Sequence, residues 1–165
     1  MKKWEIANVD KELAKELAFE CDIDPFVAMI ASSRGYNEPA LLEEFLSDEP
    51  IFSHPLELID MDKAAECINE SLMNNEKIAI YGDYDCDGVT ATALLYSYLK
   101  EKDADVIYHI PDRFNEGYGM NNSAIAQLKE LGVDLIVTVD NGIASKEEVE
   151  FAKSQGIKVV VTDHR

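Results

Sequence analysis

The sequence has few basic residues, few cysteines and no long hydrophobic run. Lysine and arginine number 15 against 33 aspartates and glutamates, which gives a formal net charge of −18 at pH 7. A domain that binds nucleic acid normally shows a basic footprint, and this chain shows the reverse. If its substrate is a polyanion, the attraction comes from metal ions or from protein outside this chain.

The cysteines and the hydrophobic runs narrow the class of protein further. Cys21, Cys67 and Cys86 are far apart and form no C-x-x-C pair, so neither a disulfide framework nor a zinc knuckle is indicated. Free thiols suit a reducing compartment. No run approaches the roughly 20 apolar residues of a membrane span, and no apolar core follows the two N-terminal lysines. We therefore expect a cytoplasmic protein without membrane contact.

The hydrophobic pattern changes near residue 60. Before this point the pattern predicts short helices, at about 9–20, 25–34 and 39–46. Asp24 followed by Pro25 is typical of a helix start, because aspartate caps the first turn and proline suits the first helical position. After it, helices and strands alternate. The predicted helices are 61–74, 88–101, 121–131 and 145–155, and the predicted strands are 77–82, 104–110, 134–139 and 157–162.

Three of the predicted strands, KIAIYG, VDLIVTV and IKVVVT, are nearly continuous apolar runs. Such runs are typical of a parallel sheet covered on both faces. Gly88 is expected to turn the chain into a helix that begins at Val89 and is apolar almost all round, hence buried. The sequence thus predicts an α/β fold, with a parallel doubly wound sheet at residues 60–165 and a small helical extension at residues 1–59.

Acidic residues and one histidine follow the predicted strands: Asp83, Asp85 and Asp87 after the first, Asp140 after the third, and Asp163 and His164 after the fourth. Because the carboxyl ends of parallel strands meet at one edge, we expect these side chains to lie together. Neighbouring carboxylates stay ionised only when cations neutralise them. Oxygen ligands with one imidazole indicate Mn²⁺ or Mg²⁺. Two such ions, roughly 3.5 to 4 Å apart, would activate a water and hold a phosphoryl group.

Other interpretations of these motifs have less support. D-x-D-x-D-G also begins a calcium-binding EF-hand loop, but Leu94 stands at position twelve, where that loop needs glutamate. The segment from Asp85 to Thr90 is similar to the D-x-D-G-[TV] signature of haloacid-dehalogenase-type phosphatases, yet no lysine and paired acidic motif follow at later strand ends. Taken singly, the DNG segment also fits a turn with a helix cap, and the DH segment an unstructured tail.

Taken together, GDYDCDGVTATALL, TVDNGI and VTDH resemble motifs I, II and III of the DHH phosphoesterase superfamily. The form GDYDxDG is similar to that of the RecJ branch, the single-strand-specific 5′ to 3′ DNA exonucleases. IPDRFNEGYGMN (110–121) and HPLELIDMDKAAECI (54–68) are similar to two further segments of that branch. The resemblance spans roughly residues 30–164.

The resemblance implies roles for individual residues. The implied metal ligands, which are also the catalytic residues, are Asp85, Asp87, Asp140 and His164, and the supporting carboxylates are Asp83 and Asp163. Arg113 is a candidate phosphate contact, with a surface ion pair to a nearby acid as the alternative. Arg165 stands where the family motif has a second histidine; it could bind the substrate phosphate through two hydrogen bonds but not act as an acid or base.

The family domain continues beyond the position of Arg165. We therefore expect the N-terminal part of a metal-dependent 5′ to 3′ single-stranded DNA exonuclease of DNA repair and recombination, inactive or weak alone. The implied partners are single-stranded DNA, bound through the full-length protein, and single-stranded-DNA-binding protein. Two alternatives stay open: a non-catalytic binding module with the DHH fold, and a DHH phosphodiesterase for short oligonucleotides or cyclic dinucleotides.

Overall fold

The computed structural model describes residue 5, residues 7–48 and residues 54–163. The chain divides into two compact units, Met1–Ser53 and His54–Arg165, and each is described by itself. The short 3-10 helix η1 (Pro55–Glu57) falls in the second unit, where it contacts α4 (Met61–Met73). The hydrophobic pattern alone assigned this segment to the helical extension. Within the described residues, none of the helices combines the length and hydrophobicity of a membrane span.

The first unit contains α1 (Lys11–Glu20), α2 (Pro25–Ser33) and α3 (Pro39–Leu46), as the helical patterns predict. α1 begins two residues later than predicted because Asp10 is its N-cap, and its side chain accepts hydrogen bonds from the first-turn N–H groups. Asp24 caps α2 in the same way, directly before Pro25. A small apolar core holds the three helices together: Leu17, Ala18, Ala28, Ala31 and Leu42.

The second unit is a parallel sheet with helical connections, and the predicted α/β fold is confirmed. After α4 the elements are β1 (Ile78–Tyr81), α5 (Cys86–Glu101), β2 (Val106–His109), α6 (Asn122–Glu130), β3 (Leu135–Val139), α7 (Lys146–Ser154) and β4 (Lys158–Thr162). The strand order is β2-β1-β3-β4, and every neighbouring pair is parallel. β1 therefore lies between β2 and β3, and the strand order reverses beside it. In open α/β sheets ligands bind outside the strand ends at such a point.

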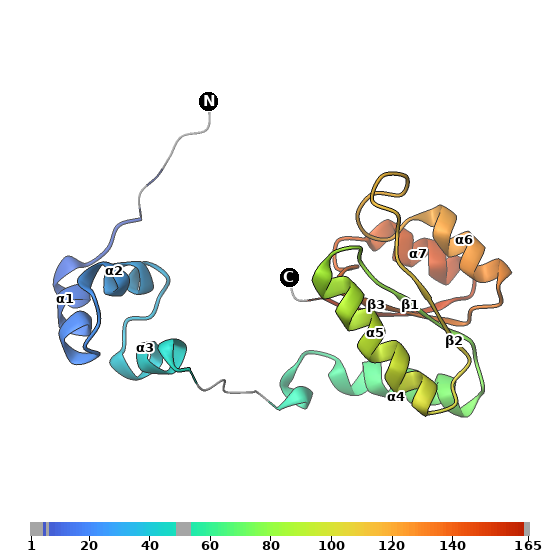
Figure 1. The fold of residues 1–165 in the computed structure, drawn as a ribbon, viewed down its shortest axis with the longest axis horizontal. Helices are drawn as coiled ribbons and strands as arrows, with labels where there is room; N and C mark the ends of the chain where they lie inside the picture. The colour runs from blue at the N-terminus through green and yellow to red at the C-terminus, as the bar shows by residue number, and fades with distance from the viewer. Residues whose placement is uncertain (1–4, 6, 49–53, 164–165) are drawn as a thin grey trace. The chain divides into compact units, whose positions relative to one another are not determined.

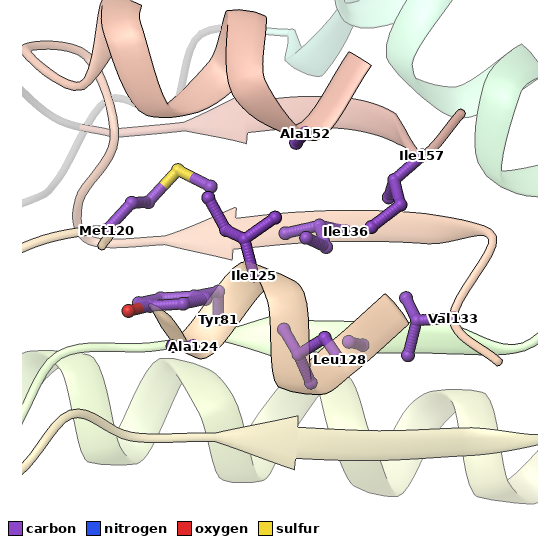
Figure 2. Close-up of a cluster of buried hydrophobic side chains, with 10 residues drawn as sticks. Tyr81, Met120, Ala124, Ile125, Leu128, Val133, Ile136, Ala152 and Ile157 are labelled. Atoms are coloured by element: carbon purple, nitrogen blue, oxygen red, sulfur yellow. The ribbon is translucent and has the colours of Figure 1, made fainter. Parts of the chain in front are cut away.

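Helices cover both faces of this sheet (Figure 1). Alternate residues of β1 point to opposite faces, as they do in any strand. Ala79 and Tyr81 pack with α6 and α7, and Figure 2 shows the ring of Tyr81 beside Met120 and the α6 side chains. Ile78 and Ile80 pack on the opposite face with α4 and α5. Because both faces are covered, each residue of β1 is buried, which explains its continuous apolar run.

Helix α5 differs from its prediction in two respects. It begins at Cys86, and Gly88 lies inside its first turn, so the predicted start at Val89 is wrong. It is also not buried all round, because Leu94 is 76% exposed and Tyr98 is 54% exposed. The buried positions lie on the single stripe that faces the sheet: Gly88, Thr92 and Leu99.

Candidate metal centre

The carboxyl ends of β1, β3 and β4 bring acidic residues to one edge of the sheet. Asp83 follows β1 after one intervening residue, Asp140 directly follows β3, and Asp163 directly follows β4. Val139 pairs with Thr162 in the parallel register, so the ends of β3 and β4 are level. The acidic residues that lie far apart in the sequence therefore converge on this edge.

Asp83, Asp85 and Asp140 form the carboxylate cluster. Each offers one carboxylate oxygen, and these three atoms all lie within 4.8 Å of one another. Asp83 is buried, Asp140 is partly buried and Asp85 is exposed, so the cluster runs from the interior of the unit to its surface. Carboxylates this close repel one another unless a cation lies between them. Oxygen-only ligands of this kind suit Mg²⁺ or Mn²⁺, and this cluster could hold such an ion.

Local backbone geometry explains how Asp83 and Asp85 reach the cluster. Asp85 is the N-cap of α5, and its Oδ1 accepts a hydrogen bond from the backbone N–H of Gly88 at 3.0 Å. A Cβ placed on Gly88 would lie 2.6 Å from the Cβ of Asp83 and 2.7 Å from its Cα. Gly88 is thus required for close approach, because only a residue without a side chain lets the Asp83 backbone lie against the helix.

Asp87 and Asp163 lie at the same edge. Asp87 is in the first turn of α5 and is exposed. Together with Asp140 and Asp163 it lines a cavity of about 830 Å³, whose other walls are largely apolar and include Leu94. Asp163 is also held locally, because its Oδ2 accepts a hydrogen bond from the backbone N–H of Ile143 at 3.2 Å. The remaining predicted site residues, His164 and Arg165, lie outside the described residues.

The segment 110–121 places Arg113 over the ring of Tyr84. The Arg113 guanidinium lies 5.3 Å from the centre of the Tyr84 ring, and Tyr84 stands between two of the clustered aspartates in the sequence. The Tyr118 ring meets the Tyr84 ring edge-on, with 6.5 Å between their centres. Within the described residues Arg113 forms no ion pair, so the alternative of a pairing with a nearby acid is not observed there. The contacts of Tyr84 with Arg113 and Tyr118 were not predicted from the sequence, where its position inside GDYDCDG was the available signal.

Glu116 anchors this segment to the sheet. Its Oε1 accepts a hydrogen bond from the backbone N–H of Asp112 at 2.9 Å, and its Oε2 accepts one from Nδ2 of Asn121 at 3.1 Å. Oε2 also lies 3.0 Å from Nε2 of His109, the last residue of β2. The backbone N–H of Asp112 is the main cause that lowers the pKa of Glu116; Asn121 and His109 add to it, and partial burial opposes it.

Tyr81, at the end of β1, also holds this segment in place. Its hydroxyl donates to the backbone carbonyl of Gly119 at 3.3 Å and accepts a hydrogen bond from Nδ2 of Asn121 at 3.2 Å. Burial raises the pKa of Tyr81, so the hydroxyl stays protonated and remains a donor. The last residue of β1 therefore supports the segment that carries Arg113.

Comparison with known proteins assigns the class. The family model "DHH family, N-terminal domain" matches residues 77–165, the part of the chain that contains the whole sheet and its acidic edge. The chain belongs to the DHH family. The resemblance found in the motifs is thus confirmed at the level of the family.

Within that family the chain is similar to RecJ. It is 42% identical over 163 residues to the single-stranded-DNA-specific exonuclease RecJ of Bacillus subtilis, covering 98% of this chain and 21% of that protein. It is 33% identical over 163 residues to RecJ of Escherichia coli, covering 98% of this chain and 28% of that protein. The chain thus spans about a quarter of these curated relatives.

Two solved structures share the fold. A crystal structure of exonuclease RecJ bound to manganese has a TM-score of 0.64 and 38% identity, covering 70% of this chain and 29% of that one. RecJ of Thermus thermophilus in complex with Mn²⁺ has a TM-score of 0.61 and 29% identity, covering 97% of this chain and 22% of that one. The ion in those structures matches the oxygen-rich donor set at the sheet edge of this chain.

Proposed function

We propose that this chain is part of a metal-dependent phosphodiester hydrolase, a RecJ-type 5′ to 3′ single-stranded DNA exonuclease. One observation carries the proposal: in a chain similar to RecJ, the carboxylate oxygens of Asp83, Asp85 and Asp140 lie within 4.8 Å of one another at the edge where ligands of parallel sheets bind. Because the chain spans only part of its relatives, the activity belongs to the longer protein and this chain alone is expected to be inactive or weak.

The site residues divide the work between metal binding and substrate positioning. The metal ligands that we propose are Asp85, Asp87, Asp140 and His164, with Asp163 in support. Asp83 joins them, because its oxygen belongs to the carboxylate cluster. Bound Mn²⁺ or Mg²⁺, as two ions, would supply a metal-bound water acidic enough to attack at neutral pH. Arg113 and Arg165 are proposed to bind the substrate phosphate, and the planar guanidinium suits that contact.

The partners and location follow from the same proposal. Single-stranded DNA is the proposed substrate, as the names of the RecJ relatives state for those proteins. A net charge of −18 repels DNA, so we propose that the longer protein supplies the surface that attracts it. Single-stranded-DNA-binding protein is a further proposed partner, and the cytoplasm is the proposed location.

Isothermal titration with Mn²⁺ tests the metal centre. The wild-type chain is expected to bind Mn²⁺, and the double variant Asp85→Ala, Asp140→Ala to lose that binding. Glu43→Ala, Glu44→Ala is a matched control, because it removes the same charge from exposed positions on α3. Equal Mn²⁺ binding by the wild type and the Asp85, Asp140 variant would contradict the proposal.

The substrate is tested in the longer protein. Nucleotide release from 5′-phosphorylated single strands is expected with Mn²⁺ and is expected to disappear in Asp87→Ala. Faster turnover of dinucleotides than of long single strands would instead favour a phosphodiesterase of short substrates. No turnover of either substrate, with Mn²⁺ binding retained, would indicate a binding module.

A further inference from the structure

A layer of polar contacts joins the strand ends that lead into the carboxylate cluster. The Asn141 side chain is fully buried, and its Nδ2 donates to the backbone carbonyl of Tyr81 at 3.1 Å and to that of Val139 at 3.0 Å. Tyr81 and Val139 are the last residues of β1 and β3. One amide group therefore joins the ends of two neighbouring strands at the point where their ladder of backbone hydrogen bonds stops.

Thr138 extends this layer to the third strand. Its buried Oγ1 donates to the backbone carbonyl of Asn141 at 2.7 Å and accepts a hydrogen bond from the backbone N–H of Thr162 at 3.3 Å. In return, Oγ1 of Thr162 donates to the backbone carbonyl of Thr138 at 2.6 Å. Asn141, Thr138 and Thr162, which we call the polar clamp, thus connect the ends of β1, β3 and β4.

The backbone conformations of Asp140 and Gly142 allow the clamp to form. Gly142 has a φ of +107°, and a Cβ at this position would lie 2.7 Å from Oγ1 of Thr138, so only glycine fits above that hydroxyl. Asp140 adopts a φ of +60°, a left-handed conformation that raises the free energy of a residue other than glycine. The hydrogen bond from Asn141 to the carbonyl of Val139 spans Asp140 and holds it in that conformation.

The clamp contributes less to the free energy of folding than an apolar core of the same size would. Oδ1 of Asn141 is buried and has no hydrogen-bond partner in the described part of the chain. A buried polar atom left unpaired costs about 1 to 3 kcal/mol, and an apolar side chain of similar size would avoid that loss. The strands that the clamp joins lead directly into Asp83, Asp140 and Asp163. The arrangement therefore suits the control of geometry at the strand ends.

We propose that Asn141 and Thr138 are positioning residues that set the spacing of the metal-binding carboxylates. The inference rests on the proposed function, in that it takes the carboxylate cluster as the metal site. Neither side chain belongs to the carboxylate cluster; both would act through the backbone that carries Asp83 and Asp140. Loosening the clamp separates the carboxylates, and the affinity for the ion falls because the remaining ligands must be drawn together on binding. Residues that orient metal ligands typically change metal affinity 10- to 100-fold when altered.

Thr138 offers a matched pair of variants for the test. Thr138→Val has the same shape but lacks the hydroxyl, whereas Thr138→Ser keeps the hydroxyl. Mn²⁺ affinity of each purified chain is measured by electron paramagnetic resonance of the free ion. We expect Thr138→Val to bind at least tenfold more weakly than wild type, and Thr138→Ser to stay within about threefold. Asn141→Ala is expected to weaken binding as Thr138→Val does.

Val133→Ala is the control for a general loss of stability. Val133 is fully buried and lies before the first residue of β3, at the end of that strand opposite to the clamp. Its truncation is expected to lower the free energy of unfolding without changing Mn²⁺ affinity. Unchanged affinity in Thr138→Val, or an equal loss of affinity in Val133→Ala, would overturn the inference.

A metal-free measurement separates this inference from the proposed function. The backbone N–H of Tyr84 donates to Oδ1 of Asp83, and that of Gly88 donates to Oδ1 of Asp85, so their amide resonances report the carboxylate positions. The clamp predicts that both resonances shift in Thr138→Val and not in Val133→Ala. If wild type fails to bind Mn²⁺, the proposed function fails, and these amide resonances alone decide the positioning role. Unshifted resonances in Thr138→Val would overturn it.

Discussion

Oδ1 of Asp85 accepts a hydrogen bond from the backbone N–H of Gly88 at 3.0 Å, although Asp85 also belongs to the carboxylate cluster. The same side chain therefore caps α5 and stands in the candidate metal site. Capping needs a hydrogen-bond acceptor, which asparagine also provides, whereas metal binding also needs the negative charge. The two roles can consequently be separated by substitution.

We predict that Asp85→Asn keeps the stability of the chain and that Asp85→Ala does not. Loss of the cap in Asp85→Ala is expected to lower the free energy of unfolding by about 1 kcal/mol, and Asp85→Asn to change it by only a few tenths. Both variants are expected to lose most Mn²⁺ affinity. Urea unfolding without metal and calorimetric titration measure the two effects. An equal loss of stability in both variants would contradict the capping role.

Gly88→Ala is expected to destabilise the second unit, although alanine favours a helix by about 1 kcal/mol over glycine. The added Cβ would lie 2.6 Å from the Cβ of Asp83, so the backbone must shift. Overpacking of this kind costs roughly 1 to 3 kcal/mol. Ser97→Ala, at an exposed position of the same helix, is the control and should change stability by no more than about 0.5 kcal/mol. Higher stability of Gly88→Ala in urea unfolding would show that the close approach is unimportant.

Thr92→Val is expected to stabilise the chain. Thr92 is 4% exposed, and within the described residues its buried Oγ1 has no hydrogen-bond partner. Valine keeps the shape and removes the unpaired hydroxyl, which should raise the free energy of unfolding by about 1 kcal/mol. Thr92→Ser keeps the hydroxyl and should not show this gain. Thermal and urea unfolding measure both, and a loss of stability in Thr92→Val would reveal a partner for the hydroxyl.

The pH dependence of stability should report on Glu116. Its pKa is lowered in the folded chain, mainly by the backbone N–H of Asp112. Glutamate in an unfolded chain titrates at about 4.3, so the stabilisation is complete above that pH and is lost as the pH falls through the lowered folded value. Glu116→Gln should therefore show a shallower loss of stability than wild type as the pH falls below about 4.3.

Urea unfolding across this pH range measures the slope for Glu116→Gln. Glu130→Gln makes the same change of charge at an exposed position at the end of α6 and should keep the wild-type slope. If the stability of Glu116→Gln depended on pH as that of the wild type does, the contacts of Glu116 would not favour its charged form over its protonated form. A second readout is the order of segment 110–121, which should fall in the variant because the anchor weakens.

The strands and the location of the site could be predicted because a local pattern specifies them. β1 and β3 are buried on both faces, which requires the continuous apolar runs seen in the sequence. Parallel strands also bring their carboxyl ends to one edge, so acids placed after strands must meet there. Asp85 and Asp140 were predicted on this basis, and their oxygens lie in one cluster with that of Asp83.

The remaining features depend on individual contacts that the hydrophobic pattern does not specify, some of them between residues far apart in the sequence. The exposure of Leu94 could not be predicted, because an apolar residue shows that burial is favourable and does not identify what covers it. The start of α5 depends on a capping hydrogen bond, which composition alone does not reveal. Asn141 resembled an ordinary turn residue, since its role depends on the carbonyl of Tyr81, 60 positions earlier in the chain.

The strand order also determines when the metal site can form during folding. β1 and β3 are neighbours in the sheet, but α5, β2 and α6 lie between them in the sequence. The backbone N–H of Lys77, for example, donates to the side chain of Asp134, 57 positions later. Bringing β1 and β3 together costs conformational entropy of the intervening chain before the contacts between the strands form. Pairing between such distant strands is therefore slow. Asp83 and Asp140 therefore meet late, and we expect Mn²⁺ to slow unfolding of the second unit without accelerating its folding.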